Sequence, residues 1–91
     1  MKWYSSRMKK IYIVLGTTGE YADQCEWPVI AYFDETKAKE HVIKAGRRST
    51  ELIQEYGWSK IPRGNNEFDP IMQVDYTGVE YRIVDVDLGD S

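Results

Sequence analysis

The chain has 91 residues, the size of one small domain, and no apolar stretch approaches the roughly 20 residues that a membrane-spanning helix needs. Hydrophobic residues make up 42% and charged residues 30%, which is typical of a globular protein. The formal net charge is −3, which disfavours a nucleic-acid-binding domain because such domains usually carry a basic excess.

The chain is expected to begin with an extension and two strands. Met8 and the two lysines after it resemble a translation start, so we expect a flexible N-terminal extension over residues 1–8 and a single domain over 9–91. Residues 9–16 and 28–33 are rich in Ile, Val and Tyr and predict two β-strands. Together they predict a hairpin whose connection is GTTGEYADQCEW, residues 16–27.

A long helix is predicted over residues 35–56. Asp34 is a good N-cap residue, and apolar residues then recur every three to four positions from Ala38 onward. Gly57 is a suitable C-cap residue. Gly46 lies in the middle of this helix and weakens it by roughly 1 kcal/mol relative to alanine.

The last third of the chain predicts one or two further strands. Residues 58–70 read as a loop, 71–76 as a short strand and 79–88 as the final strand. In this final strand the apolar residues change sides after Ile83, which predicts a β-bulge near Ile83 and Val84. The order β-β-α-β-β predicts an α+β domain, with an antiparallel sheet of three to four strands and one long helix packed on one face.

No cofactor or metal site is predicted. Gly16 and Gly19 are followed by acidic residues and another strand, without the Lys-Ser/Thr pair of a P-loop, so they indicate a turn. The acidic residues of this stretch lack the spacing of an EF-hand. Cys25 and His41 are too few for a zinc site.

No catalytic residue is predicted either, and we expect a non-enzyme. A cysteine and a histidine can form a nucleophilic pair, but any chain with one of each would offer Cys25 and His41. His41 falls on the apolar side of the helix, where a hydrogen-bonded core histidine is the common outcome. Because Cys25 cannot form an internal disulfide, we expect a reducing, cytoplasmic setting.

The connection between the first two strands is the predicted contact with a partner. It has about a dozen residues where a tight hairpin needs two to five. Tyrosine and tryptophan rings anchor interfaces, and carboxylates beside them steer basic partners. The predicted partner-binding residues are Glu20, Tyr21, Asp23, Glu26 and Trp27. Packing onto the core is the alternative for both rings, and for Trp27 it is the favoured one.

Charge favours two further hypotheses. The predicted helix carries a basic face that would contact nucleic acid, although a solvated helix surface is the ordinary explanation for it. This alternative basic face consists of Lys37, Lys44, Arg47 and Arg48, with Trp58 beyond the helix. Residues 64–91 contain seven acidic residues and one basic residue, and these acids would stand in for phosphates on a partner.

A structural or assembly protein that dimerises through a free sheet edge is the third hypothesis.

The run KIYIVLGTTGEYADQCEWPVIAYFDETKAKEH and the closing DYTGVEYRIVDVDL resemble small accessory proteins of phages and prophages. The resemblance implies a non-enzymatic protein that binds and modulates a host macromolecule in the cytoplasm of the host cell. An inhibitor of a bacterial defence system, of the anti-CRISPR kind, is one form of that activity. A host protein is the expected partner, nucleic acid is less favoured, and no membrane contact is expected.

Overall fold

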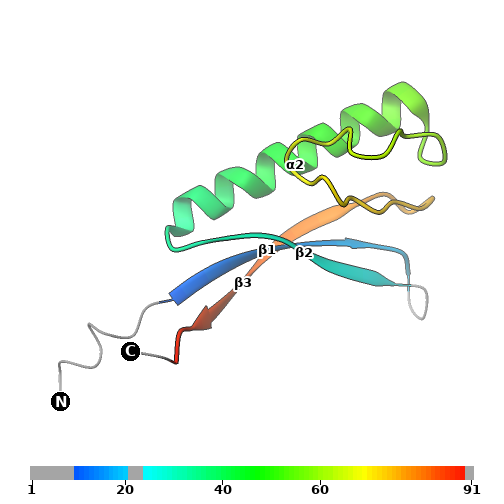
Figure 1. The fold of residues 1–91 in the computed structure, drawn as a ribbon. Helices are drawn as coiled ribbons and strands as arrows, with labels where there is room; N and C mark the ends of the chain where they lie inside the picture. Colours follow the sequence, from blue (N-terminus) through cyan, green and yellow to red (C-terminus); the bar gives the residue numbers. More distant parts are fainter. Residues whose placement is uncertain (1–9, 21–23, 90–91) are drawn as a thin grey trace, which may run out of the picture.

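The computed structural model describes residues 10–20 and 24–89, and the predicted extension over 1–8 lies outside them. Figure 1 shows a sheet with a long helix on one side of it. The elements follow one another as strands β1 (Lys10–Thr18) and β2 (Cys25–Tyr32), helix α2 (Glu35–Tyr56) and strand β3 (Glu80–Asp87). The α+β class is confirmed, with the order β-β-α-β.

The sheet has three antiparallel strands in the order β2-β1-β3. Strand β1 pairs with β3 without interruption from Lys10 opposite Asp87 to Thr17 opposite Glu80. The helix and the segment that follows it lie on the same side of the sheet (Figure 1). Tyr32 and His41 join β2 to α2 on that side through a 2.9 Å hydrogen bond.

The β-bulge lies in a different place from the one predicted. The pairing of β1 with β2 shifts between Val14 and Leu15, and Val29 is the extra residue of β2. The prediction of a bulge at Ile83 and Val84 was wrong, since this part of β3 pairs regularly with β1. The apolar residues of β3 change sides because Tyr81 and Ile83 face the helix, whereas Val84 and Val86 face the opposite side of the sheet.

Helix α2 confirms the predicted boundaries. The Asp34 side chain accepts hydrogen bonds from the backbone N–H groups of Thr36 (2.8 Å) and Lys37 (3.4 Å), which caps the first turn. At the other end the N–H of Gly57, with φ of 82°, donates to the Ile53 carbonyl. The buried residues of the helix are Ala38, Ala45, Ser49 and Leu52.

The predicted strand over 71–76 does not form. Among residues 57–79 only an isolated bridge joins Asp75 to Gly78, so the described part of the chain has three strands and not four. This segment is instead fixed by a turn and by side chains: the Gly78 N–H donates to the Asp75 carbonyl (3.0 Å), and Thr18 Oγ1 donates to Asp75 Oδ1 (3.1 Å).

Candidate protein-binding surfaces

The hairpin connection is shorter than the sequence indicated. Because β1 continues to Thr18 and β2 begins at Cys25, the connection spans residues 19–24. Glu20 is exposed on it. Tyr21 and Asp23 lie outside the described residues, so the orientation of the Tyr21 ring stays a prediction. A connection of this length is close to the two to five residues of a tight hairpin, so it gives little support for a binding loop.

Glu26 belongs to the sheet instead of a free loop. It lies on β2, and its carboxylate forms an ion pair and hydrogen bond with Arg82 of β3. The two residues are paired with Thr17 and Leu15 of β1, so the contact spans the middle strand on the side opposite the helix. Both side chains are well exposed, and such surface pairs contribute little stability.

Trp27 is a core residue, so the prediction that it contacts a partner was wrong. Only 4% of the residue is exposed, and its Nε1–H donates to Asp69 Oδ2 at 2.9 Å. Its indole lies so close to Gly16 that a Cβ atom there would come within 2.6 Å of the ring. The extra residue Val29 lets Trp27, Ile30 and Tyr32 all face the helix side, which strict alternation would not allow.

Asp69 is a buried polar residue that the sequence analysis missed, because EFDP has no periodicity and reads as a loop. It is fully buried, and its Oδ2 atom accepts hydrogen bonds from Trp27 and from the Tyr81 hydroxyl (2.7 Å). Its Oδ1 atom has no hydrogen-bond partner among the described residues. Burial, and next the contact with Asp69, raise the pKa of Tyr81, so this hydroxyl stays protonated at neutral pH.

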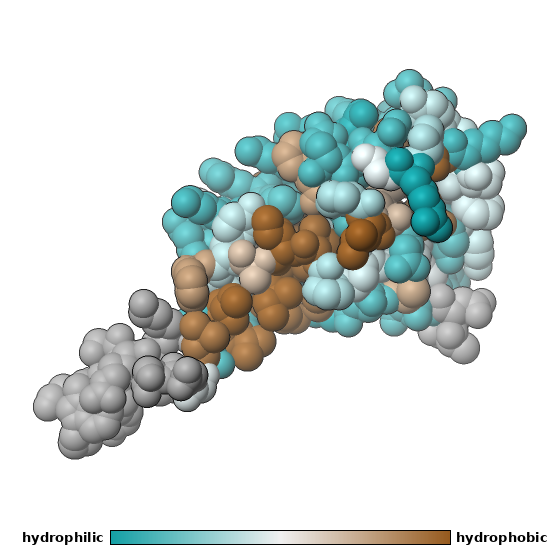
Figure 2. All heavy atoms as spheres, in the orientation of Figure 1, coloured by the Kyte–Doolittle hydropathy of each residue, from teal (hydrophilic) through white to brown (hydrophobic). Residues whose placement is uncertain are grey.

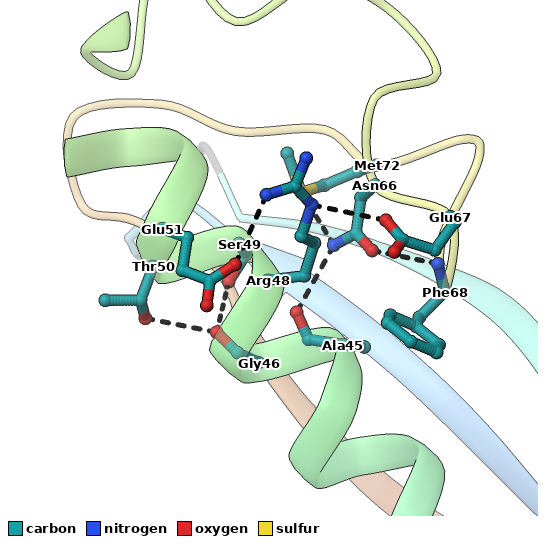
Figure 3. A network of polar contacts seen from close by, with 10 residues as sticks. All are labelled: Ala45, Gly46, Arg48, Ser49, Thr50, Glu51, Asn66, Glu67, Phe68 and Met72. Carbon is teal, nitrogen blue, oxygen red and sulfur yellow. Dashed lines mark hydrogen bonds and ion pairs between the residues drawn. The ribbon is translucent and has the colours of Figure 1, made fainter. Parts of the chain in front are cut away.

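The basic face of α2 is partly neutralised. Arg48 forms ion pairs with Glu51 and Glu67, each at 3.2 Å, and its hydrogen bond to Glu51 is the main reason that its pKa is raised (Figure 3). Lys37, Lys44 and Arg47 form no ion pair with a described residue. Trp58 is 45% exposed, just beyond the helix.

The side of α2 that carries Arg48 also holds in place the segment that follows the helix. Asn66 is buried and donates to the Ala45 carbonyl (3.2 Å), while the Phe68 N–H donates to Asn66 Oδ1 (2.9 Å; Figure 3). His41 Nε2 lies 2.7 Å from the Phe68 carbonyl. Because Nδ1 of the same ring is hydrogen-bonded to the Tyr32 hydroxyl, both ring nitrogens of His41 have partners. Arg48 and His41 are thus anchors of the fold.

No pairing of Cys25 with His41 is formed. Cys25 begins β2, whereas His41 binds Tyr32 at the other end of that strand, and the Cys25 thiol contacts Gln73 instead (3.3 Å). Within residues 10–20 and 24–89, no three His, Cys, Asp or Glu side chains gather in a way that could hold a metal ion. No described helix is long and apolar enough to span a bilayer.

The side of the sheet opposite the helix carries a second apolar surface, which no other described element covers and which we call the open face. The fully buried β1 residue Val14 points to the helix, and its neighbours Ile13 and Leu15 point the other way and are only half-buried. Register places Ala31 and Val84 beside Ile13, and Val86 beside Ile11. Its apolar residues are Ile11, Ile13, Leu15, Ala31, Val84 and Val86.

The open face has an apolar end and a polar end. Its apolar residues gather where β1 begins and β3 ends, and Figure 2 shows hydrophobic side chains clustered over this end of the molecule. Toward the hairpin the same side carries Thr17, Glu26, Glu80 and Arg82. One side of an antiparallel sheet is normally solvated and polar, so this apolar surface departs from the usual pattern.

A groove lies along the other flank of the helix, between α2 and β3. Its volume is about 610 Å³, and it is lined mainly by Val42, Ile43, Gly46 and Arg47 of the helix and by Val79 and Tyr81. On the opposite flank, Asn66 and Phe68 fill the angle between the helix and the sheet. The two flanks of α2 therefore differ: the segment after the helix packs against one, and the other borders the groove.

The chain matches no protein-family profile, no curated protein and no solved structure.

Proposed function

We propose that this chain is a non-enzymatic protein that binds and modulates a host protein, and that the open face is its main contact surface. The observation that carries the proposal is the row of half-buried and exposed apolar side chains on the uncovered side of the sheet, of which Val86 is 47% exposed. A partner that covers this row removes apolar area from water, which is the main driving force of protein association.

The hairpin is a second, polar contact in this proposal, at the opposite end of the sheet from the apolar residues of the open face. Glu20 is exposed beyond β1, and Tyr21 and Asp23 follow it in the chain. Carboxylates at the edge of an apolar contact steer a basic partner and raise its association rate more than its affinity. A defence-system inhibitor of a phage is one form of such a protein, and the resemblance noted above is the basis for that form. The cytoplasm of the host cell is its proposed location.

Binding of nucleic acid is the less favoured function. The basic face offers Lys37, Lys44 and Arg47, but Glu40, Glu51 and Glu67 lie among them. Arg48 is already paired with two of these acids. The acidic residues of 64–89 are largely engaged within the chain as well, since Asp69 is buried and Asp85 binds Lys10 at 3.2 Å. These contacts weaken the proposal that the acids stand in for phosphates.

The experiment compares lysine substitutions on two surfaces. The immobilised protein is used to capture its partner from bacterial lysate, the partner is identified by mass spectrometry, and its affinity is then measured with purified protein. Val86→Lys and Ile11→Lys place a charge on the open face and should weaken binding about tenfold or more. Ile71→Lys is the matched control, because Ile71 is 58% exposed on the segment after α2.

Two results would contradict the proposal. The first is equal binding by Val86→Lys and Ile71→Lys variants that both keep the wild-type circular dichroism spectrum and urea midpoint. The second concerns the hairpin: changing Glu20, Asp23 and Glu26 together to serine should slow association, most clearly at low salt. An unchanged association rate would remove the hairpin from the interface.

A further inference from the structure

We infer that the groove between α2 and β3 binds an extended segment of a partner protein, which pairs with β3 as a fourth strand and places a carboxylate against Arg47. This goes beyond the proposed function, because it concerns the other side and the edge of the sheet. Strand β3 lies at the edge of the sheet and pairs only with β1 among the described residues. Its outer edge therefore presents backbone N–H and C=O groups that an added strand can satisfy.

The two edges of the sheet are not equally open to an added strand. Strand β2 contains Pro28, which has no N–H, and the bulge at Val29. Both features protect an edge against pairing. Strand β3 contains no proline, and its eight residues pair with β1 in regular register. An incoming segment is therefore directed to β3.

The groove supplies space for side chains of such a segment. Residues 79–82 form its strand side, and Val42 and Ile43 give its helix side an apolar character. Ile43 is largely exposed in spite of its size. Since alternate residues of a strand point to the same side, every second side chain of the added segment would enter the groove.

Gly46 keeps the middle of the groove free of side chains. A Cβ atom at this position would meet nothing closer than Tyr81 Cδ2 at 4.0 Å, so packing in the folded chain does not require a glycine. Glycine in the middle of a helix is unfavourable by roughly 1 kcal/mol relative to alanine. What glycine provides here is close approach of another backbone to the helix.

The charge of Arg47 favours an acidic segment in the groove. The charged residues that line the groove are Arg47, Arg82 and Glu80, and Arg82 is already paired with Glu26. Arg47 forms no ion pair with a described residue, so a carboxylate of the segment can pair with it. A second copy of this chain is a poorer occupant. Antiparallel pairing of two β3 strands about their centre would place Glu80 of each copy opposite Asp87 of the other and Arg82 opposite Asp85, so repulsive and attractive pairs offset each other and self-pairing gains no net charge attraction.

The test uses three synthetic six-residue peptides. The first alternates valine and threonine and ends in aspartate, the second ends in lysine instead, and the third is the aspartate peptide with N-methylated central amides. Each is titrated into the ¹⁵N-labelled full chain, and amide shifts are mapped by NMR. The aspartate peptide should shift residues 79–82 and 42–47. The lysine and N-methylated peptides should bind at least about tenfold more weakly.

Two variants complete the test. Arg47→Ala should weaken the aspartate peptide about tenfold, and Gly46→Leu, which keeps a good helix former, should abolish its binding. Ile71→Lys, on the exposed segment after α2, is the control and should bind the peptide normally. The inference is overturned if the aspartate peptide causes no shifts at 79–82, or if Gly46→Leu binds it like the wild type while its helix content is unchanged.

Discussion

Asp69 joins three parts of the chain that are distant in sequence. Its Oδ2 atom accepts from Trp27 of β2 and from Tyr81 of β3, while its own backbone lies in the segment after α2. Both donors carry large rings that pack between the helix and the sheet, so the carboxylate fixes the rings as well as the backbone. A buried acceptor of this kind matters most through the donors that it would leave unsatisfied if it were removed.

Asp69→Ala is therefore expected to lower the free energy of unfolding by about 2–4 kcal/mol, since two donors lose their acceptor and a small cavity forms. The measurement is urea unfolding at pH 7, followed by circular dichroism. Asp87→Ala is the control, because Asp87 is exposed and 3.9 Å from Lys10, and its loss should stay below about 0.5 kcal/mol. Equal losses for the two variants would contradict a structural role for Asp69.

Tyr81 gives the fold a dependence on alkaline pH. Its pKa is raised in the folded state above the ordinary value of 10.0, so the folded chain holds this proton more tightly than the unfolded chain does. The contribution to stability is complete below pH 10 and is lost as the pH rises beyond it. Between pH 9 and 11, the urea midpoint of Tyr81→Phe should fall less steeply than that of the wild type, although the variant is less stable at pH 7. Equal slopes of the urea midpoint against pH for the two proteins would show that Tyr81 does not cause the loss of stability at alkaline pH.

At the scale of the elements, helix α2 contains a residue that weakens it. Gly46→Ala should raise the free energy of unfolding by up to about 1 kcal/mol, because alanine favours the helix and its Cβ atom meets only ordinary contacts. Gly57→Ala is the opposite case, since Gly57 has φ of 82° and alanine there should be destabilising by about 1–2 kcal/mol. Thermal unfolding of both variants measures these changes in stability. An increase in stability for Gly57→Ala as well as for Gly46→Ala would contradict the prediction.

The elements differ in how far the sequence predicts them. Helix α2 could be bounded because Asp34 and Gly57 are local signals whose effect does not depend on the rest of the fold. The bulge could not be placed, because it depends on the pairing of β2 with β1 and not on the residues of β3. The burial of Trp27 follows from that same bulge and from Asp69. Asn66 and Asp69 give no periodic signal, since polar anchors in irregular segments act through contacts distant in sequence.

For the molecule as a whole, charge is balanced locally within the described residues. The excess of acids near the end of β3 is offset by Lys10, which lowers the pKa of Asp85 through a hydrogen bond and its charge. Arg48 in turn lies between two glutamates. Glu40, Glu51 and Glu67 lie among the basic residues of α2, so this face of the helix has mixed charge.

The chain is consequently expected not to retard labelled DNA or RNA in gels, even near 50 mM salt, where phosphate binders are tightest. A basic variant, Glu51→Gln with Glu67→Gln, releases Arg48 and provides the matched comparison. If the wild type retards nucleic acid and releases it steeply as salt rises, the basic face is functional and binding of a host protein is no longer the favoured function.

The pairing of Lys10 with Asp87 brings the first and last described strands side by side, at a distance that a short linker can bridge. The chain could therefore be made circular there and reopened at residues 60–63, where Lys60 and Arg63 are exposed. In the permuted order β3-β1-β2-α2, the pairing that now spans most of the sequence becomes a local hairpin. Such a permutant should keep the fold and reach it faster, because folding rates rise as contacting residues come closer along the chain.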